Sequence, residues 1–192
     1  NVSIHGISAA DVADAPTFSE FWPSLWPRVS GPLVAHNAAF DISVLRHALD
    51  QSCIRYPETD YFCTRVIAKL VWPEHPTYAL DHIAHVLGIS FVHHDAEEDA
   101  HACALIAVAA CKQLNALSLY DLQNGCGLRV GHLFAEGYCP CGGPYAARVT
   151  TQSRDKLRAA YITPSATPTD EQHPCYGMAF VFTGALSSMP RK

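Results

Sequence analysis

Residues 33–41 read LVAHNAAFD, and this stretch decides the fold. An apolar run ends in a polar turn, and apolar residues then recur every three or four positions, which predicts a strand, a tight turn and a helix. Asn37 can cap the helix with its side chain, which places Asp41 in the first helical turn. Exposed backbone N–H groups and the helix dipole stabilise negative charge at that end of a helix. We therefore expect the Asp41 carboxylate to stay ionised.

A second stretch, residues 93–99, reads HHDAEED. Asp95 can cap another helix, and Glu98 stands three positions later, where its side chain can reach back to the capping residue. His94 then precedes the helix and Asp99 lies just inside it. His93 is the weaker partner for Asp99 because its spacing is one residue longer, although a slip of one residue stays open as an alternative.

Four features, in this order, resemble the DEDDh 3′–5′ exonucleases, typified by the epsilon proofreading subunit of bacterial DNA polymerase III. They are residues 4–8 (IHGIS), residues 36–41 (HNAAFD), the segment at Thr64, and the spacing of His94 and Asp99. The resemblance implies that Asp41 and Asp99 hold divalent metal and that His94 is the general base. It also implies a substrate-binding role for a set of residues in the first two motifs: His5, Gly6, His36, Asn37 and Phe40.

The residue types suit this chemistry. Hydrolysis of a phosphodiester is promoted by two hard divalent ions about 3.5–4 Å apart, and Mg²⁺ or Mn²⁺ prefers oxygen ligands such as Asp41 and Asp99. An imidazole, here His94, can take a proton from water near neutral pH. Two carboxylates are few for two ions, and the family's Asp-x-Glu motif should lie upstream of Ile4. We therefore expect the printed chain to be a truncated fragment with little or no activity, although its parent is an exonuclease.

Composition limits the class of protein. The 192 residues are 49% hydrophobic and 16% charged, which fits one globular domain with an appendage. No apolar run approaches the ~20 residues that span a bilayer, so we expect no membrane partner. Eight cysteines without a secretory leader favour reduced thiols and a cytoplasmic location.

Charge is divided unevenly along the chain. Lys, Arg, Asp and Glu give residues 1–110 a balance of −8 and residues 111–192 a balance of +3. An acidic domain has low non-specific affinity for duplex DNA, because non-specific affinity comes from basic side chains that neutralise phosphates. It is compatible with capture of single-stranded or frayed 3′ ends of DNA through bound metals, since metal charge reverses the local field.

The remaining patterns predict an α/β fold over residues 1–115. Residues 61–63 favour a strand, Thr64 can cap the helix after it, and Gly88 can end a further helix. The helix at Asp99 has a face of small residues, which allows close packing on a sheet. By resemblance this is a ribonuclease-H-like exonuclease fold, N-terminally truncated so that it lacks its first strands.

Residues 116–172 are predicted to form an irregular connector and a linker. Glycines interrupt residues 125–145, where regular structure is not expected. Cys126, Cys139 and Cys141 could bind zinc together with His132, but their spacing matches no familiar zinc motif, and reduced thiols in a loop are the simpler interpretation.

Residues 173–192 contain the run FVFTG at residues 180–184 and resemble the start of a BRCT domain, cut at its C-terminus. By that resemblance, Thr183 and Gly184 form a turn that can bind phosphate. An exonuclease followed by BRCT implies a replication or repair enzyme whose partners include a DNA polymerase subunit or repair proteins.

Two other functions stay open. The chain could be a non-catalytic adaptor that grips DNA ends or a polymerase, which dependence on metal would separate from an enzyme. It could also be a 3′–5′ exoribonuclease, because no residue pattern here senses a 2′-hydroxyl.

Overall fold

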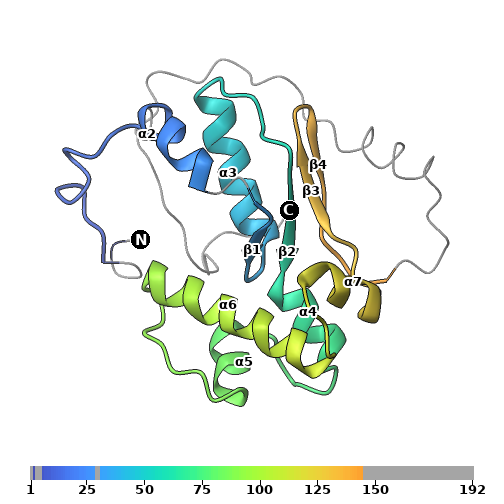
Figure 1. The fold of residues 1–192 in the computed structure, drawn as a ribbon. Helices are drawn as coiled ribbons and strands as arrows, with labels where there is room; N and C mark the ends of the chain where they lie inside the picture. The colour runs from blue at the N-terminus through green and yellow to red at the C-terminus, as the bar shows by residue number, and fades with distance from the viewer. Residues whose placement is uncertain (1, 3–5, 29–30, 145–192) are drawn as a thin grey trace.

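The computed structural model describes residue 2, residues 6–28 and residues 31–144 (Figure 1). The predicted roles of His5, Thr183 and Gly184, and the BRCT and linker segments after residue 144, lie outside these residues. The described part contains six α-helices: α2 (Phe18–Leu25), α3 (Ala39–Gln51), α4 (Thr64–Val71), α5 (Leu80–Val86), α6 (Ala96–Gln113) and α7 (Leu119–Cys126). A short 3-10 helix, η1 (Trp26–Arg28), follows α2.

Within the described residues, four strands form one mixed sheet in the order β1-β2-β3-β4. β1 (Leu33–Ala35) runs parallel to β2 (Thr59–Cys63), with Leu33 opposite Tyr61. β3 (Gly131–Phe134) and β4 (Gly137–Cys139) form an antiparallel hairpin, and β3 pairs with β2. The expected α/β class is therefore confirmed.

The hairpin corrects the prediction that residues 125–145 are irregular. Leu133 and Phe134 are buried in the sheet, and Gly131 allows the Tyr61 ring to approach the strand. The glycines of this segment therefore serve packing as well as turns. The domain boundaries at residues 115 and 172 stay predictions, but the sheet joins strands from both sides of residue 115.

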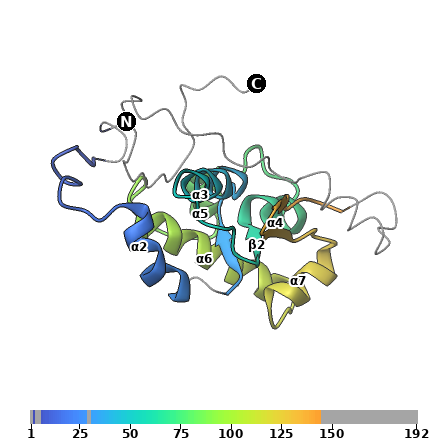
Figure 2. The ribbon, with the colours of Figure 1, turned by 90° about the horizontal axis from the view of Figure 1, so that it is seen from above.

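Helices cover both faces of the sheet. Successive strand residues point to opposite faces, so Phe62 packs with Ile67, Ala110 and Leu122, whereas Tyr61 and Cys63 pack with Ala38 and Ile42. The first group comes from α4, α6 and α7, and the second from the start of α3. Figure 2 shows α3 on one side of β2 and α7 on the other.

Two helix ends test the sequence-based predictions. Gly88 follows α5 with φ of +71°, which confirms it as the stop. Thr64, expected to cap α4, is instead the first residue of that helix and is fully buried, and Cys63 stands at the cap position. Among the described helices, none has the length and apolar content needed to cross a bilayer.

Candidate functional site

The first motif folds as predicted into strand, turn and helix, but Asn37 does not cap α3. The cap position belongs to Ala38, and no side chain satisfies the first amides there. Asn37 adopts φ of +64°, a left-handed conformation that Asn tolerates better than most residues. Its Oδ1 accepts a hydrogen bond from Nη1 of Arg65 at 3.1 Å. The Asn37 side chain, which the local sequence pattern predicts as the cap of α3, is therefore hydrogen-bonded to Arg65, 28 residues further along the chain.

Asp41 lies in the first turn of α3, as expected, but the helix end does not lower its pKa. Burial raises the pKa of Asp41 to about 6, and a hydrogen bond with its own backbone offsets this only in part. The cost of removing the carboxylate from water thus outweighs the stabilising field of the helix end. A cation placed beside Asp41 would favour the ionised form.

The second motif begins α6. The carboxylate of Asp95 accepts hydrogen bonds from the amides of Glu97 and Glu98, both at 3.0 Å, which confirms it as the cap. The amide of Asp95 donates to the carbonyl of Val92 instead of receiving a reach-back contact from Glu98. Asp99 follows in the first turn and is only 6% exposed.

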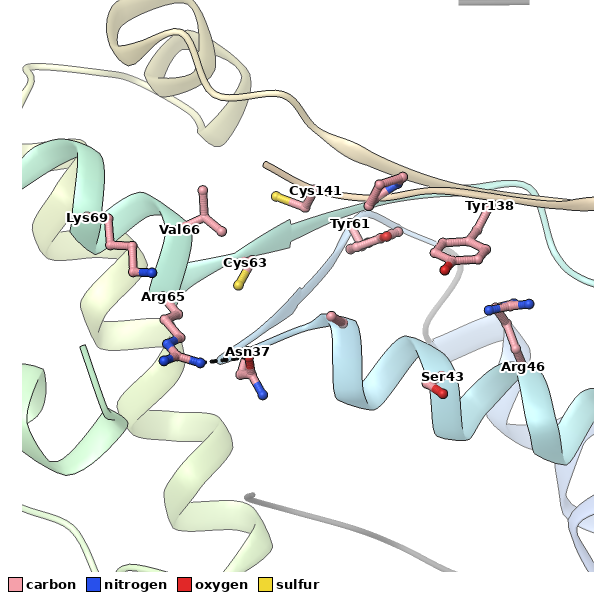
Figure 3. Close-up of a pocket in the computed structure, with 12 residues that line it drawn as sticks. Asn37, Ser43, Arg46, Tyr61, Cys63, Arg65, Val66, Lys69, Tyr138 and Cys141 are labelled. Carbon is pink, nitrogen blue, oxygen red and sulfur yellow. Dashed lines mark hydrogen bonds between the residues drawn. The ribbon is translucent and has the colours of Figure 1, made fainter. Parts of the chain in front are cut away.

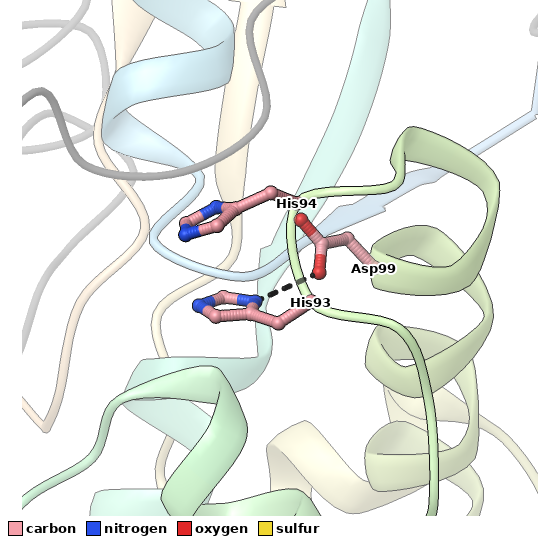
Figure 4. Close-up of side chains that lie close together, drawn as sticks. All are labelled: His93, His94 and Asp99. Carbon is pink, nitrogen blue, oxygen red and sulfur yellow. Dashed lines mark hydrogen bonds and ion pairs between the residues drawn. The ribbon is translucent and has the colours of Figure 1, made fainter. Parts of the chain in front are cut away.

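His93, His94 and Asp99 form a compact group in which one potential ligand atom of each lies within 4.8 Å of the others (Figure 4). Nδ1 of His93 is 3.1 Å from Oδ1 of Asp99, so the residue expected to be the weaker partner makes the contact. His94 adopts φ of +73°, and its ring stacks on that of His93 with 4.0 Å between centroids. The turn before α6 thus brings both imidazoles to the buried carboxylate.

Thr64 ties the two motifs together. Its buried hydroxyl lies 2.9 Å from Nδ1 of His36, in the turn before α3, and 3.3 Å from Sγ of Cys103 on α6. Nε2 of His36 donates to the carbonyl of Tyr78 at 2.9 Å, so in the neutral ring Nδ1 accepts from Thr64. Burial lowers the pKa of His36. α6 packs on β1, and Leu33 and Ala35 of β1 pack against the cluster that contains Ile42 of α3, so the helices that carry Asp41 and Asp99 contact one strand.

Other predicted residues are placed as follows. Both ring nitrogens of His36 are occupied by the fold, which fixes the turn that precedes α3. Gly6 is exposed with φ of +72°, and its amide donates to the carbonyl of Val2. Phe40 is half-buried in the first turn of α3. A direct contact with substrate remains a prediction for each of them.

The zinc alternative is not supported by the described residues. His132 instead lies between two carboxylates, with Nδ1 2.7 Å from Asp60 and Nε2 3.2 Å from Glu58. In residues 2, 6–28 and 31–144, the group at Asp99 is the one cluster of three potential ligand side chains. Burial raises the pKa of the Cys141 thiol to about 11, which disfavours the thiolate that zinc requires.

A cavity of about 450 Å³ lies between α3, α4 and the end of β4, and no sequence pattern predicted it (Figure 3). Its walls include three basic side chains, Arg46, Arg65 and Lys69. Arg46 belongs to α3, whereas Arg65 and Lys69 belong to α4, so no contiguous basic run marks them. The sequence feature that could have indicated them is the low number of basic residues in this region. Residues 1–110 contain only two further Lys or Arg residues, Arg28 and Arg55.

The carboxylates fit a divalent cation. Asp41 is a desolvated carboxylate, and no other described side chain donates a hydrogen bond to it. Asp99 is buried and has one imidazole partner. Oxygen ligands of this kind suit Mg²⁺ or Mn²⁺. Asp41 lies outside the compact group around Asp99, so the described residues supply ligands from two separate helix ends.

Comparison with known proteins matches residues 1–107 to the RNase_T family, described as Exonuclease. The 3′–5′ exonuclease DinG of Staphylococcus saprophyticus is 30% identical over 111 residues, and DinG of Staphylococcus aureus (strain USA300) is 28% identical over 111 residues. Each match covers 57% of this chain and 12% of the relative, so the chain spans a small part of these proteins. A solved structure of exonuclease X in complex with 5′ overhanging duplex DNA has a TM-score of 0.49 and 22% identity, over 66% of this chain and 72% of that chain.

The mixed four-stranded sheet and its helices are consistent with the expected ribonuclease-H-like exonuclease fold. Asp41, His93, His94 and Asp99 all lie within the matched residues. Because the family match covers more than half of the 192 residues, the chain belongs to this exonuclease family.

Proposed function

We propose that this chain carries the site of a metal-dependent 3′–5′ exonuclease that acts on DNA ends in proofreading or repair. The observation that carries the proposal is the placement of Asp41 and Asp99 in the first turns of two helices that both contact β1. The 3′–5′ polarity is supported by the name of the relatives, 3′–5′ exonuclease DinG. The truncation and the BRCT-mediated contact with a polymerase subunit or repair proteins stay predictions, as does the cytoplasmic location.

Asp41 and Asp99 are the proposed ligands for Mg²⁺ or Mn²⁺. When bound, two such ions supply a nucleophilic hydroxide and neutralise charge on the attacking and leaving oxygens. His93 holds Asp99 in place through the contact between its Nδ1 and Oδ1. A hydrogen-bonded ligand keeps its orientation, so His93 acts as a positioning residue.

His94 is the proposed general base. Among the described residues, neither of its ring nitrogens is hydrogen-bonded, and the ring lies beside the Asp99 carboxylate (Figure 4). An imidazole there can take the proton that a water molecule loses as it attacks the phosphorus. A set of five residues is proposed to contact the terminal nucleotide: His5, Gly6, His36, Asn37 and Phe40. Thr183 and Gly184 are proposed to bind phosphate.

The test follows a 5′-labelled single-stranded oligonucleotide with Mn²⁺ on a sequencing gel. The samples are the 192-residue chain, the product of its gene expressed from the native start codon, and the Asp99→Asn and Asp121→Asn variants of the active form. Asp121 is a matched control because it is an exposed aspartate in the first turn of α7.

We expect stepwise shortening from the 3′ end that Asp99→Asn abolishes and Asp121→Asn retains. We expect at most trace activity from the 192-residue chain, which supplies only two of the proposed carboxylate ligands. Binding without cleavage in every sample would contradict the proposal that the protein is an exonuclease and would favour a non-catalytic adaptor. Preference for an RNA oligonucleotide would replace DNA as the substrate.

A further inference from the structure

We infer that the cavity between α3 and α4 binds a phosphate group, either of the nucleic-acid strand that feeds the catalytic site or of a free nucleotide. The assignment to a strand rests on the proposed nuclease function, whereas phosphate binding itself does not. The cavity holds about 450 Å³, which is within the usual range for ligand sites.

Positive charge is concentrated in this cavity. Residues 1–110 carry a balance of −8, yet three of their five basic residues, Arg46, Arg65 and Lys69, line it. Arg65 and Lys69 stand one helical turn apart on α4, so they share a face. The lining includes no Asp or Glu residue. An acidic protein that gathers its few cations around one cavity creates a local site for an anion.

The basic groups have unused hydrogen-bonding capacity. Nε of Arg46 and Nε of Arg65 are each buried without a hydrogen-bond partner among the described residues. In the same part of the chain, none of the three cations forms an ion pair with a carboxylate. Buried polar atoms are normally paired, so two unpaired guanidinium nitrogens beside one cavity call for an acceptor. A phosphate oxygen is an acceptor suited to a guanidinium group.

Other contacts hold the guanidinium groups in place. The Arg46 guanidinium carbon lies over the Tyr138 ring, 4.0 Å from its centroid, which is a cation–π contact. Nη1 of Arg65 donates to Oδ1 of Asn37 at 3.1 Å (Figure 3). Because both side chains are fixed before any ligand binds, less conformational entropy is lost on binding.

The cavity is distinct from the site at Asp41 but adjoins it. Ala39 and Ser43 line the cavity, whereas Asp41 does not. Residues two positions apart on a helix point about 200° apart, so the carboxylate lies on the other side of the first turns of α3. Asn37, in the turn before α3, borders the cavity. A strand crossing the start of α3 could therefore reach both places.

The test measures binding of a fluorescein-labelled oligothymidylate to the 192-residue chain by anisotropy, in EDTA and at about 50 mM salt, where phosphate contacts are strong. EDTA separates the two proposals, because binding here needs neither metal nor cleavage. Arg46→Gln/Arg65→Gln is compared with Arg28→Gln/Arg55→Gln. Both double variants remove two positive charges, and Arg28 and Arg55 are exposed residues outside the cavity.

We expect the cavity variant to weaken binding about tenfold or more and to flatten the salt dependence by about two charges, while the control stays within about twofold of the parent. Equal weakening in both double variants, or no binding by the parent chain, would overturn the inference. If the cavity variant fails to fold, Ser43→Glu replaces it, since Ser43 is exposed and the change adds a repelling charge at the cavity wall. Unchanged binding by this variant would likewise overturn the inference.

Competition with thymidine monophosphate distinguishes the two sources of phosphate. Binding of the oligonucleotide at least tenfold tighter than that of the mononucleotide assigns the cavity to a strand. Equal affinities assign it to a free nucleotide. If the gene product does not cut DNA and yet the cavity variant loses binding, the nuclease proposal fails and the phosphate site stands.

Discussion

Nδ1 of His93 lies 3.1 Å from Oδ1 of Asp99, so the carboxylate proposed to hold metal is positioned by the histidine immediately before the proposed base. His94 stacks on His93, and neither of its ring nitrogens is hydrogen-bonded within the part of the chain that the structure describes. The two histidines should therefore have different effects when they are substituted.

His94→Asn should lower the rate of DNA cleavage by about 10²–10⁴-fold, the usual contribution of a general base. His93→Asn should act mainly through the orientation of Asp99, with a smaller loss of rate and weaker affinity for metal. Single-turnover cleavage rates across a range of Mn²⁺ concentrations separate these effects. If His93→Asn loses more rate than His94→Asn at saturating metal, the general base is His93 and not His94.

Mn²⁺ should stabilise the folded chain, because a ligand that binds only the folded state adds about 2.7 kcal/mol at a hundred times its dissociation constant. Asp41→Asn and Asp99→Asn should lose most of this increase, since each removes a proposed ligand. Thermal unfolding of the 192-residue chain with and without Mn²⁺ measures it, and EDTA should reverse it. Asp121→Asn should behave like the parent, and an equal loss in that variant would indicate weak binding to surface charge.

The parts of the site that depend on near neighbours were predictable from sequence. The cap of α6 involves Asp95 and the two amides that follow within three residues, and the strand, turn and helix around Asp41 follow from apolar spacing. Such interactions are set by the local chain, so a single sequence contains them.

The rest depended on contacts between distant residues. The Asn37 amide is bound by Arg65, and the ionisation of Asp41 depends on how packing buries it. The choice of His93 over His94 as the partner of Asp99 follows from the left-handed backbone of His94, which spacing alone does not reveal. The basic cavity joins α3 to α4, so the sequence shows its members only as isolated residues.

His36 should make the fold sensitive to acid. Burial lowers its pKa, so as pH falls below about 6.5 the unfolded chain takes up a proton that the folded chain resists. The contribution of His36 to the free energy of unfolding is therefore greatest above about pH 6.5. As the pH decreases from there to the lowered pKa of the folded state, this contribution falls by at most about 1.4 kcal/mol per pH unit.

Urea unfolding of His36→Gln between pH 5 and pH 8, a range of roughly the width over which histidine titrates, should show a shallower loss of stability toward acid than the parent. The variant should also be less stable at neutral pH by about 1–2 kcal/mol, since it disturbs the hydrogen bonds to Thr64 and Tyr78. His85→Gln, at an exposed position on α5, is the control and should keep the parent's slope. Parallel curves for the parent and His36→Gln would contradict the assignment.

Gly131 should tolerate no side chain. A Cβ atom at this position would collide with the ring of Tyr61, which is 2% exposed and whose hydroxyl donates to the carbonyl of Cys139 at 2.9 Å. The Tyr61 residue pairs with β3 and its hydroxyl is hydrogen-bonded to β4, so the ring cannot easily move away. Gly131→Ala should therefore destabilise the fold by about 1–3 kcal/mol, the usual cost of overpacking.

Gly31→Ala is the matched control, because nothing lies within 4 Å of a Cβ atom there, and it should change stability by no more than about 0.5 kcal/mol. Equal unfolding midpoints in urea for the two variants would show that the hairpin does not pack on Tyr61, and the wall that Tyr61 and Tyr138 give the basic cavity would then be lost as well.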